Sequence, residues 1–486
     1  MQVLEVREGY EAKLNEWLSK EKAAVGLINC VGRLMYEKGV ELVFFRNHLL
    51  DASISDVLQL FDYAKDVVFK PIDVETTTKV AEALLKYDIA PSKIDIGKLT
   101  QEFIDTKTDI NGLDGIIINN LGEFIGEDKN TVTPKDVVLF GFGRIGRLAA
   151  RELVKQFGKG QQLRLRAIVT RKVSLAEVEK RASLLRNDSV HGAFRGSVIA
   201  DPTNKRIIVN GQIIQLIEAA NPEDIDYTSY GINDALLIDN TGVFKDKEAL
   251  SRHLKAKGIS KVILTAPGKE IPNIVYGINQ KDLDIENDHI FSAASCTTNA
   301  ISPVLKVVND TLGIERGHIE TVHAYTNDQN LLDNMHKNTR RGRSAAVNMV
   351  ITETGAGKAV TKVIPELKDK LTANAVRVPV PNGSLAILSL QLKKETTLEE
   401  INNLLRKAAL EGDLVNQINY RIDDELVSTD IIGNTCCSVY DSKATIVSPE
   451  GKNVVLYVWY DNEFGYTKQV IRLAKHVAKV RRLIYY

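Results

Sequence analysis

The chain has 486 residues, of which 44% are hydrophobic, and 63 acidic side chains balance 63 basic ones. A chain of this length exceeds one small core, so we expect two or three domains. Zero net charge gives no general attraction to nucleic acid or to an anionic membrane. No apolar run approaches the ~18 residues of a membrane span, and the charged N-terminus lacks the apolar core of a secretory signal. Four cysteines are too few for a disulfide framework, which favours a reducing cytoplasm.

Residues 1–133 are predicted to form a mostly helical domain. Apolar residues recur at three- and four-residue spacing over 10–39, further helices are expected over 54–68 and 74–89, and 40–45 fits a short strand. This segment shows no catalytic constellation. The simplest hypothesis is a docking or oligomerisation module that buries its apolar faces against a partner. A polar connection over 126–136 separates it from the rest of the chain.

Strand and helix signals alternate over residues 134–295, which predicts a doubly wound α/β domain of the Rossmann type. Beyond it, long strands at 318–325, 385–394 and 453–461 mix with helices. They predict a second, α+β catalytic domain over 296–465 with an antiparallel sheet. A basic amphipathic C-terminal helix over 466–486 is expected to complete the Rossmann domain.

Three glycines, Gly141, Gly143 and Gly146, follow a predicted strand and precede a predicted helix in the pattern G-x-G-x-x-G. The first allows a tight turn, the second lets a pyrophosphate approach the backbone, and the third permits close helix–strand packing. The helix N-terminus then offers free N–H groups to the anion. By itself the motif also fits a plain tight turn, but this strand–loop–helix setting predicts a dinucleotide site.

The end of the next strand bears on which dinucleotide is bound. A NAD site usually has an Asp or Glu there, which accepts hydrogen bonds from the ribose hydroxyls. This strand ends with Thr170, Arg171 and Lys172 and carries no acid. Arg and Lys attract the 2′-phosphate of NADP, whereas a carboxylate repels it. The sequence leans toward NADP, and the alternative, a NAD site beside a solvated basic turn, stays open.

Cys296 and His323 are the candidate catalytic residues. Cys296 lies in SAASCTTNA before a helix-like run, and a helix N-terminus would lower the pKa of its thiol. Asn299 and the backbone N–H of Cys296 are candidate donors to a developing oxyanion. His323, on a predicted strand, would hold the thiolate and shuttle protons if it met the cysteine. Each residue alone also fits a structural role in the core, and spacing does not show that they meet.

Seven motifs occur in order: GFGRIGR, DSVHG, NTGVF, SCTTN, TVHAYTNDQ, the segment from Thr354 to Pro381, and WYDNEFGY. Together they resemble phosphorylating glyceraldehyde-3-phosphate dehydrogenase over residues 134–486, essentially the whole length of that enzyme. The preceding residues lie outside the usual family and resemble the N-terminal extension of a longer bacterial form, for which a gluconeogenic role is often suggested. The resemblance therefore implies a role in glycolysis or gluconeogenesis.

The resemblance implies a role for each matching residue. Cys296 would attack the aldehyde, His323 would activate the thiol and take the hydroxyl proton, and inorganic phosphate would cleave the thioester to give 1,3-bisphosphoglycerate. Thr326 and Arg377 would bind the phosphate of the substrate, and Ser295, Thr297, Arg340, Thr354 and Gly355 complete the substrate and phosphate contacts. The implied contacts of NADP or NAD are Gly141, Gly143, Arg144, Ile145, Gly146, Thr170, Arg171, Thr241, Gly242, Thr265, Asn462 and Tyr466, with Asn462 on the nicotinamide amide. No metal is implied.

Two departures from the family bear on the cofactor. Thr170–Arg171 replaces the Asn-Asp of the family, and Asn334–Met335 stands where NAD-specific members often carry Leu-Pro. Both lean toward relaxed or NADP-directed specificity. A third departure, Ala300, replaces a common second cysteine and denies Cys296 a close thiol partner.

The resemblance also implies a homotetramer in which a long loop over 327–350 packs at a subunit interface. Two rival functions stay open. One is erythrose-4-phosphate dehydrogenase, which would use the same cysteine and histidine. The other is a non-catalytic regulatory or binding protein on the same scaffold.

Overall fold

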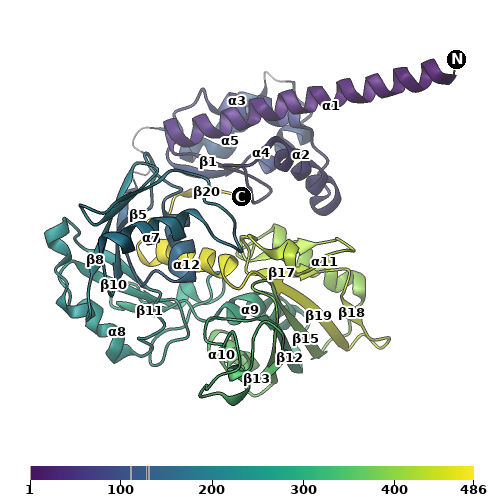
Figure 1. Ribbon diagram of the computed structural model, residues 1–486. Coiled ribbons are helices and arrows are strands. Elements are labelled where there is room, and N and C mark those ends of the chain that lie inside the picture. The colour runs from purple at the N-terminus through teal and green to yellow at the C-terminus, as the bar shows by residue number, and fades with distance from the viewer. Residues whose placement is uncertain (1, 110–111, 127–128, 130–131) are drawn as a thin grey trace. The chain divides into compact units, whose positions relative to one another are not determined.

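The computed structural model describes residues 2–109, 112–126, 129 and 132–486 (Figure 1). The chain divides into two compact units. The first unit consists of residues 1–134, 157–162 and 480–486, and the second of residues 135–156 and 163–479. Part of the polar connection predicted over 126–136, namely 127–128 and 130–131, lies outside the described residues.

The first unit packs helices against a four-stranded sheet with the strand order β2-β1-β3-β20. Ser53 and Asp73 start two of its helices, since each side chain accepts a hydrogen bond from a first-turn N–H. The mostly helical domain is confirmed, with a small sheet of which only the first strand was predicted. Its elements are α1 (Gln2–Arg33), β1 (Glu41–Phe44), β2 (Asn47–His48), α2 (Ile54–Tyr63), α3 (Val74–Leu84), β3 (Ser92–Asp95), α4 (Ile96–Asp105), α5 (Leu113–Leu121) and β20 (Leu483–Tyr485).

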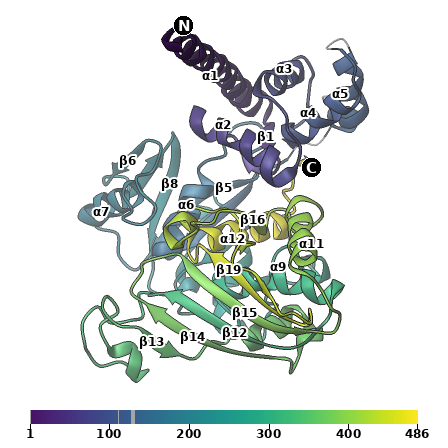
Figure 2. The ribbon, with the colours of Figure 1, turned by 90° about the vertical axis from the view of Figure 1, so that its right-hand side faces the viewer.

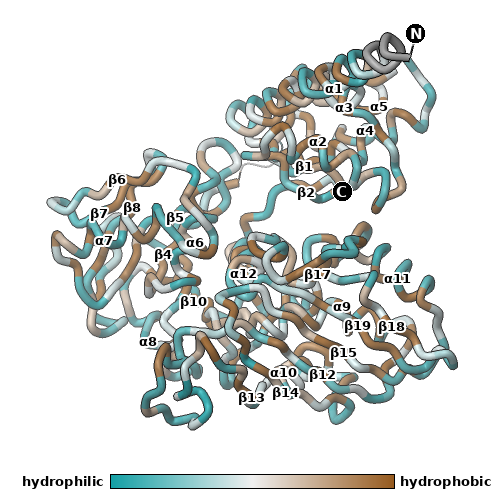
Figure 3. The backbone as a smooth tube through the Cα atoms, turned by 45° about the vertical axis from the view of Figure 1, so that its right-hand side comes forward, coloured by the Kyte–Doolittle hydropathy of each residue, from teal (hydrophilic) through white to brown (hydrophobic). Residues whose placement is uncertain are grey.

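Helix α1 contributes to the core with only part of its length. Leu27 and Val31, near its C-terminal end, are buried in the core of the first unit. Residues 9–19 are exposed, and these include Tyr10 and Trp17. Hydrophobic and hydrophilic residues alternate along the helix in Figure 3. The C-terminal part of α1 is therefore stabilised by burial in the core of the first unit, whereas residues 9–19 are exposed.

The end of the chain departs from the predicted helix over 466–486. Helix α12 (Phe464–Val477) ends early, and β20 pairs in parallel with β3 of the first unit. Side chains alternate on this strand, so Tyr485 is buried and Ile484 is exposed. The Tyr485 hydroxyl donates to Glu102, and buried Arg482 donates to the Gly160 carbonyl at 2.8 Å. The basic amphipathic pattern gave no sign of this strand because its partner comes from the opposite end of the chain.

The second unit contains the predicted doubly wound sheet, with the strand order β11-β10-β9-β4-β5-β8-β7-β6. The strands from β11 to β8 are parallel, whereas β7 pairs antiparallel with both β8 and β6. Every residue of the central strand β9 is buried, as expected where helices cover both faces of a parallel sheet. The elements are β4 (Lys135–Phe140), α6 (Arg144–Leu153), β5 (Leu163–Thr170), α7 (Leu175–Arg186), β6 (Val198–Asp201), β7 (Arg206–Val209), β8 (Gln212–Glu218), β9 (Ala235–Asp239), α8 (Lys247–Leu254), β10 (Ile259–Leu264) and β11 (Ile290–Ser292), and α12 packs against α6.

The second sheet of this unit has the strand order β13-β14-β12-β15-β19-β17-β16, with β18 paired to β19 (Figure 2). It is mixed rather than antiparallel throughout, because β12 and β14 run parallel, as do β16 and β17. Parallel pairs need a crossover, and α10 lies between β12 and β14 in sequence. The elements are α9 (Cys296–Thr311), β12 (Ile314–Ala324), β13 (Val350–Thr352), α10 (Ala356–Val363), β14 (Leu371–Val378), β15 (Ser384–Leu392), α11 (Leu398–Leu410), β16 (Ile418–Arg421), β17 (Ser438–Asp441), β18 (Ile446–Val447) and β19 (Asn453–Tyr460).

Three further properties concern the described residues as a whole. Every helix among them is too short or too polar to span a membrane. Nowhere in residues 2–109, 112–126, 129 and 132–486 do three or more His, Cys, Asp and Glu side chains gather in a way that could hold a metal ion. The four cysteines are free thiols.

Candidate active site

Cys296 is the first residue of α9, and Ser295 caps this helix by accepting a hydrogen bond from a first-turn N–H at 3.0 Å. Ala294, before the cap, has a φ of 55°, a left-handed conformation that is strained for a residue with a Cβ. Its N–H donates to the Ser292 hydroxyl at 3.0 Å, and its carbonyl accepts from the Tyr466 hydroxyl at 2.9 Å. These contacts hold the turn that places the sulfur at the start of the helix.

His323 lies near the end of β12 and faces the cysteine, with Nε2 3.6 Å from Sγ of Cys296. Its Nδ1 lies 2.7 Å from the carbonyl oxygen of Ala324 and 2.8 Å from Nη1 of Arg377. Because a guanidinium only donates, the Ala324 carbonyl is the group that can accept a hydrogen bond from a protonated Nδ1. A proton on Nδ1 leaves Nε2 free to accept the thiol proton. The fold thus brings the two candidate catalytic residues together.

The charges around this pair favour a thiol beside a neutral imidazole. Burial raises the pKa of the Cys296 thiol, and the Arg377 guanidinium offsets only part of this effect. Burial, followed by the positive charge of Arg377, lowers the pKa of His323 to about 3. The expected lowering of the thiol pKa at the helix N-terminus is therefore outweighed by desolvation. His323 is neutral at neutral pH, as a general base must be.

Asn299 does not occupy the predicted position of an oxyanion donor. Its amide nitrogen donates to the carbonyl groups of Ala293 at 2.8 Å and Ser295 at 2.9 Å, and the residue is buried. Both amide protons therefore stabilise the turn before the helix. The backbone N–H of Cys296, in the first turn of α9, has no partner within the helix and still fits the oxyanion role.

Arg377 and Thr326, expected at the substrate phosphate, lie side by side. Nη1 of Arg377 is 3.4 Å from the Thr326 hydroxyl. Nε of Arg377 is buried and has no hydrogen-bond partner among the described residues. A largely buried guanidinium with an unused donor is suited to an anion such as phosphate.

The adjacent residues Arg340 and Arg341 differ in their surroundings. Arg340 is exposed, and within the described residues its side chain makes no hydrogen bond or ion pair. Arg341 instead pairs with Asp328 and donates from Nε to the Thr352 hydroxyl at 3.1 Å. After burial, the charge of Arg341 is the largest cause that lowers the pKa of Arg377. The structure therefore places Arg341, rather than the expected Arg340, beside the site.

Thr354 and Gly355 lie at the start of α10, two and three residues after Thr352. The Thr354 hydroxyl accepts from the N–H of Ala356 at 3.2 Å, and exposed Gly355 is the residue before the helix. The N–H groups of such a helix start can bind an anion. Thr297 is instead buried, and its hydroxyl lies 3.1 Å from the hydroxyl of Tyr460.

The glycine loop has the geometry that a pyrophosphate needs. Gly141 has a φ of 93°, and a Cβ on Gly146 would lie 2.6 Å from the Gly141 carbonyl oxygen. A Cβ on Gly143 would meet nothing within 4 Å, so the backbone is open at that position. Arg144 and Ile145 begin α6, whose first N–H groups face this opening. The residues present fit a dinucleotide.

Asp239, at the end of β9, organises the expected cofactor contacts of the NTG motif. Its carboxylate accepts from the N–H and hydroxyl of Thr241 at 2.8 and 2.7 Å, and Gly242 follows with a φ of 68°. The N–H and hydroxyl of Thr265 both donate to the Asp239 carbonyl at 3.0 Å. His253 lies 2.9 Å from its second carboxylate oxygen. Sequence reasoning missed Asp239, and its place directly before NTG was the available signal.

The end of β5 has an acidic neighbour that the sequence did not reveal. Arg171 is exposed, and the Thr170 hydroxyl donates to the Lys172 carbonyl at 3.1 Å. Glu218 ends the adjacent strand β8 in register with Thr170, is exposed, and accepts from the N–H of Val173 at 2.9 Å. Basic side chains after β5 therefore lie beside the Glu218 carboxylate of β8, because these two strands, which are distant in sequence, end at the same edge of the sheet.

Asn462, expected on the nicotinamide, is buried in the loop after β19. Its Oδ1 accepts from the Ser384 hydroxyl at 2.8 Å, and that hydroxyl also accepts from the N–H of Ala324 at 3.1 Å. The amide nitrogen of Asn462 makes no hydrogen bond within the described residues, so it remains a donor for a carbonyl group. Ser384 was not predicted, because only the pairing of β15 with β12 and β19 places it there.

Comparison with known proteins agrees with this arrangement. Residues 135–247 match the family model described as the NAD binding domain of glyceraldehyde 3-phosphate dehydrogenase, and residues 295–462 match the model of its C-terminal domain. A glyceraldehyde-3-phosphate dehydrogenase of Priestia megaterium is 42% identical over 339 residues, 70% of this chain and 96% of the relative. Glyceraldehyde-3-phosphate dehydrogenase 1 of Bacillus subtilis is 42% identical over 340 residues, 70% of this chain and 97% of the relative.

A third relative also covers the N-terminal extension. The glyceraldehyde-3-phosphate dehydrogenase-like protein of Pseudomonas aeruginosa is 48% identical over 460 residues, 93% of this chain and 98% of that protein. An alignment of this length includes much of the first unit. These matches confirm the family expected from the motifs and the NAD- or NADP-binding domain. The chain is an oxidoreductase that belongs to the glyceraldehyde-3-phosphate dehydrogenase family, in a long form with an N-terminal extension.

Proposed function

We propose that this protein is a phosphorylating dehydrogenase of D-glyceraldehyde 3-phosphate, with the products 1,3-bisphosphoglycerate and NADH or NADPH. The observation that carries the proposal is the 3.6 Å contact between Sγ of Cys296 and Nε2 of His323, beside a guanidinium with an unused donor. Cys296 is the nucleophile, and His323 is the base. The family membership supports the aldehyde substrate.

His323 gives or takes the proton in each step. The Cys296 thiol gives its proton to Nε2 of His323 as sulfur bonds to the aldehyde carbon, and the resulting alkoxide takes that proton back to form a thiohemiacetal. Bound NAD(P)+ supplies the hydride acceptor at its nicotinamide C4. His323 then takes the hydroxyl proton as the hydride leaves the carbon, and a thioester remains.

Inorganic phosphate completes the reaction. A phosphate oxygen attacks the thioester carbon, the C–S bond breaks, and the thiolate of Cys296 recovers a proton from His323. Arg377 and Thr326 bind the phosphate already on the substrate. The attacking phosphate binds at the start of α10, near Thr354 and Arg341.

Cofactor preference is a separate hypothesis. Arg171, with Thr170 or Lys172, contacts the 2′-phosphate of NADP, because a guanidinium pairs well with phosphate oxygens. Glu218 opposes this by its negative charge and favours NAD. With both charges at one strand end, we infer that the enzyme uses NADP without excluding NAD, which suits reduction toward sugar.

We also propose a homotetramer in the cytoplasm. The loop over 327–350 exposes large apolar side chains, which in soluble proteins mark interaction sites when they gather in one segment. Leu331, Leu332, Met335, Val347 and Met349 are between 74% and 93% exposed. A second copy that covers this loop would bury them.

One assay tests the proposed activity. The full-length protein is incubated with D-glyceraldehyde 3-phosphate and NAD+ or NADP+, with and without phosphate, while the reduced cofactor is measured. We expect turnover that requires phosphate and is lost in Cys296→Ser. Undiminished turnover without phosphate would refute the phosphorylating assignment, and a higher kcat/KM on erythrose 4-phosphate would reassign the substrate.

A further inference from the structure

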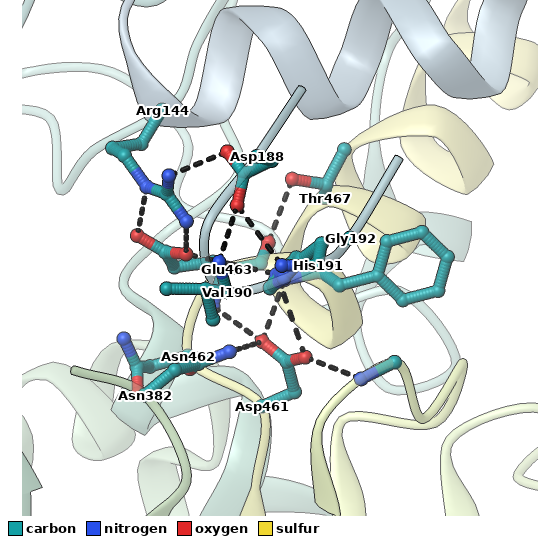
Figure 4. A network of polar contacts seen from close by, with 12 residues as sticks. Arg144, Asp188, Val190, His191, Gly192, Asn382, Asp461, Asn462, Glu463 and Thr467 are labelled. Atoms are coloured by element: carbon teal, nitrogen blue, oxygen red, sulfur yellow. Dashed lines mark hydrogen bonds and ion pairs between the residues drawn. The ribbon is translucent and has the colours of Figure 1, made fainter. Parts of the chain in front are cut away.

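One polar network joins the glycine loop to the residues around Asn462 (Figure 4). Arg144 donates from Nε to one carboxylate oxygen of Glu463 at 2.8 Å and from Nη2 to the other, which makes the pair bidentate. Its Nη1 donates to Asp188. Arg144 and Glu463 are 319 residues apart in sequence. The pair therefore connects the start of α6 with the loop that follows β19.

The charged side chains of this network are largely buried. The side chains of Arg144, Glu463 and Asp188 are 23%, 14% and 5% exposed. Burial raises the pKa of Asp188, but the N–H groups of His191 and Val190, together with Arg144, lower it to about 2. Hydrogen bonding to Glu463 raises the pKa of Arg144. Since buried ion pairs are often no more stabilising than apolar residues of the same size, stability alone does not account for the network.

The two neighbours of Asn462 in sequence are both held by the fold. Asp461 is fully buried and accepts hydrogen bonds from Nδ2 of Asn382 at 2.8 Å and from the N–H of Gly433 at 2.8 Å. Glu463, on the other side, is held by Arg144. The backbone of Asn462 is therefore fixed at one end within the catalytic domain and at the other end by the first residue of α6.

We propose that the Arg144–Glu463 pair is a positioning device that keeps Asn462 in register with the pyrophosphate-binding turn, so that one face of the nicotinamide is presented to Cys296. The proposal rests on the function proposed above, in which Asn462 donates to the nicotinamide amide. A dinucleotide would be held at two points, by its pyrophosphate at Gly143 and by its nicotinamide at Asn462. The Arg144–Glu463 pair sets the distance between the glycine loop and the loop after β19. Arg144, Glu463 and Asp188 are thus positioning residues.

Glu463→Gln tests this role because glutamine keeps the size of the side chain and removes its charge. We expect kcat to fall roughly 10- to 100-fold, since a shift of about 1 Å at the reacting atoms has this effect. The Kd of ADP, which probes the adenosine half, should stay close to wild type. With substrate deuterated at the aldehyde carbon, NMR should find label at both C4 positions of the reduced cofactor, whereas wild type labels one.

Two further variants serve as a positive and a negative control. Asn462→Ala should reproduce the loss of kcat and the mixed labelling. Glu223→Gln, which breaks a more exposed ion pair with Arg252 in the same unit, should behave as wild type. A loss of stability alone would lower the amount of active enzyme without changing which C4 position is labelled.

The outcomes separate the two proposals. Wild-type kcat and single labelling in Glu463→Gln, with both lost in Asn462→Ala, would overturn the positioning role and leave the proposed function standing. Wild-type behaviour of both variants would overturn the nicotinamide contact as well. If Glu463→Gln does not fold, the apolar double variant Arg144→Met/Glu463→Leu replaces it, and single labelling in that variant overturns the proposal.

Discussion

Sγ of Cys296 and Nε2 of His323 lie 3.6 Å apart although 27 residues separate them in sequence. The other three cysteines, Cys30, Cys436 and Cys437, are buried. Burial raises the pKa of Cys30 to about 11 and is the largest cause that raises the pKa of Cys437 to about 12. Cys296 alone combines partial exposure with a base at hydrogen-bonding distance.

A limiting amount of iodoacetamide at about pH 8 should therefore alkylate Cys296 and spare the other thiols. Peptide mass mapping measures this selectivity. Cys296→Ser should take up no label and should lose activity roughly 10⁴-fold or more. Equal labelling of the four cysteines in folded protein would revive the idea of a non-catalytic binding protein.

Arg171→Ala should raise KM for NADP roughly tenfold and leave KM for NAD nearly unchanged, because it removes a charge-assisted hydrogen bond to the 2′-phosphate. Glu218→Gln should have the opposite effect and lower KM for NADP relative to KM for NAD, because it removes the repulsion between the carboxylate and the 2′-phosphate. Steady-state kinetics with both cofactors measure the two ratios. If Arg171→Ala leaves KM for NADP unchanged, Arg171 does not determine the cofactor preference.

Arg341→Ala should raise KM for inorganic phosphate roughly 10- to 100-fold, which corresponds to the loss of one charged hydrogen bond. Arg340→Ala is the matched control, since its side chain is exposed and should change KM less than twofold, about the noise of a surface substitution. Initial rates over a range of phosphate concentrations compare the variants. A larger effect at Arg340 would restore the assignment made from the sequence.

Glu152 on α6 should make the fold sensitive to acid. Burial raises its pKa, but Lys468 at 2.7 Å and Lys155 together lower it to about 2 from 4.5. A carboxylate with a depressed pKa stabilises the fold above its unfolded pKa, and this contribution of roughly 3 kcal/mol is lost as the pH falls toward about 2.

Glu152→Gln should therefore lower Tm at neutral pH, and its difference from wild type should narrow below about pH 4.5. Thermal unfolding at several pH values, down to the lowest at which the fold survives, follows the difference. Glu223→Gln, at a more exposed pair, serves as the control with little difference at any pH. A gap that stays constant with pH would mean that packing, and not charge, makes Glu152 important.

Tyr485→Ala should destabilise the first unit by roughly 3–5 kcal/mol, because it removes a large aromatic side chain from the core. Ile484→Ala is the control on the opposite face of the same strand, where the side chain is exposed. Limited proteolysis of the full chain, with mapping of the cleavage sites, compares the stability of the first unit. Equal resistance of both variants would show that β20 contributes little to it.

Local patterns in the sequence identified most of the chemistry. The glycine spacing at Gly141, Gly143 and Gly146 predicted the dinucleotide loop, and alternating strands and helices predicted the doubly wound sheet. The motif around Cys296 and the one around His323 each identified a reactive residue. Each of these features depends on turn geometry, strand burial or helix capping. Residues that are close together in sequence determine these properties, so the sequence alone reveals them.

Contacts between distant residues were decided only by the tertiary structure. Glu218 reaches the end of β5 from another strand, Arg341 rather than Arg340 turns toward Asp328, and β20 pairs with a strand at the other end of the chain. Burial also reversed the expected effect of the helix N-terminus on the pKa of Cys296. Sequence alone determined the family and its reactive residues, whereas register, burial and charge pairing, which depend on which segments meet, required the fold.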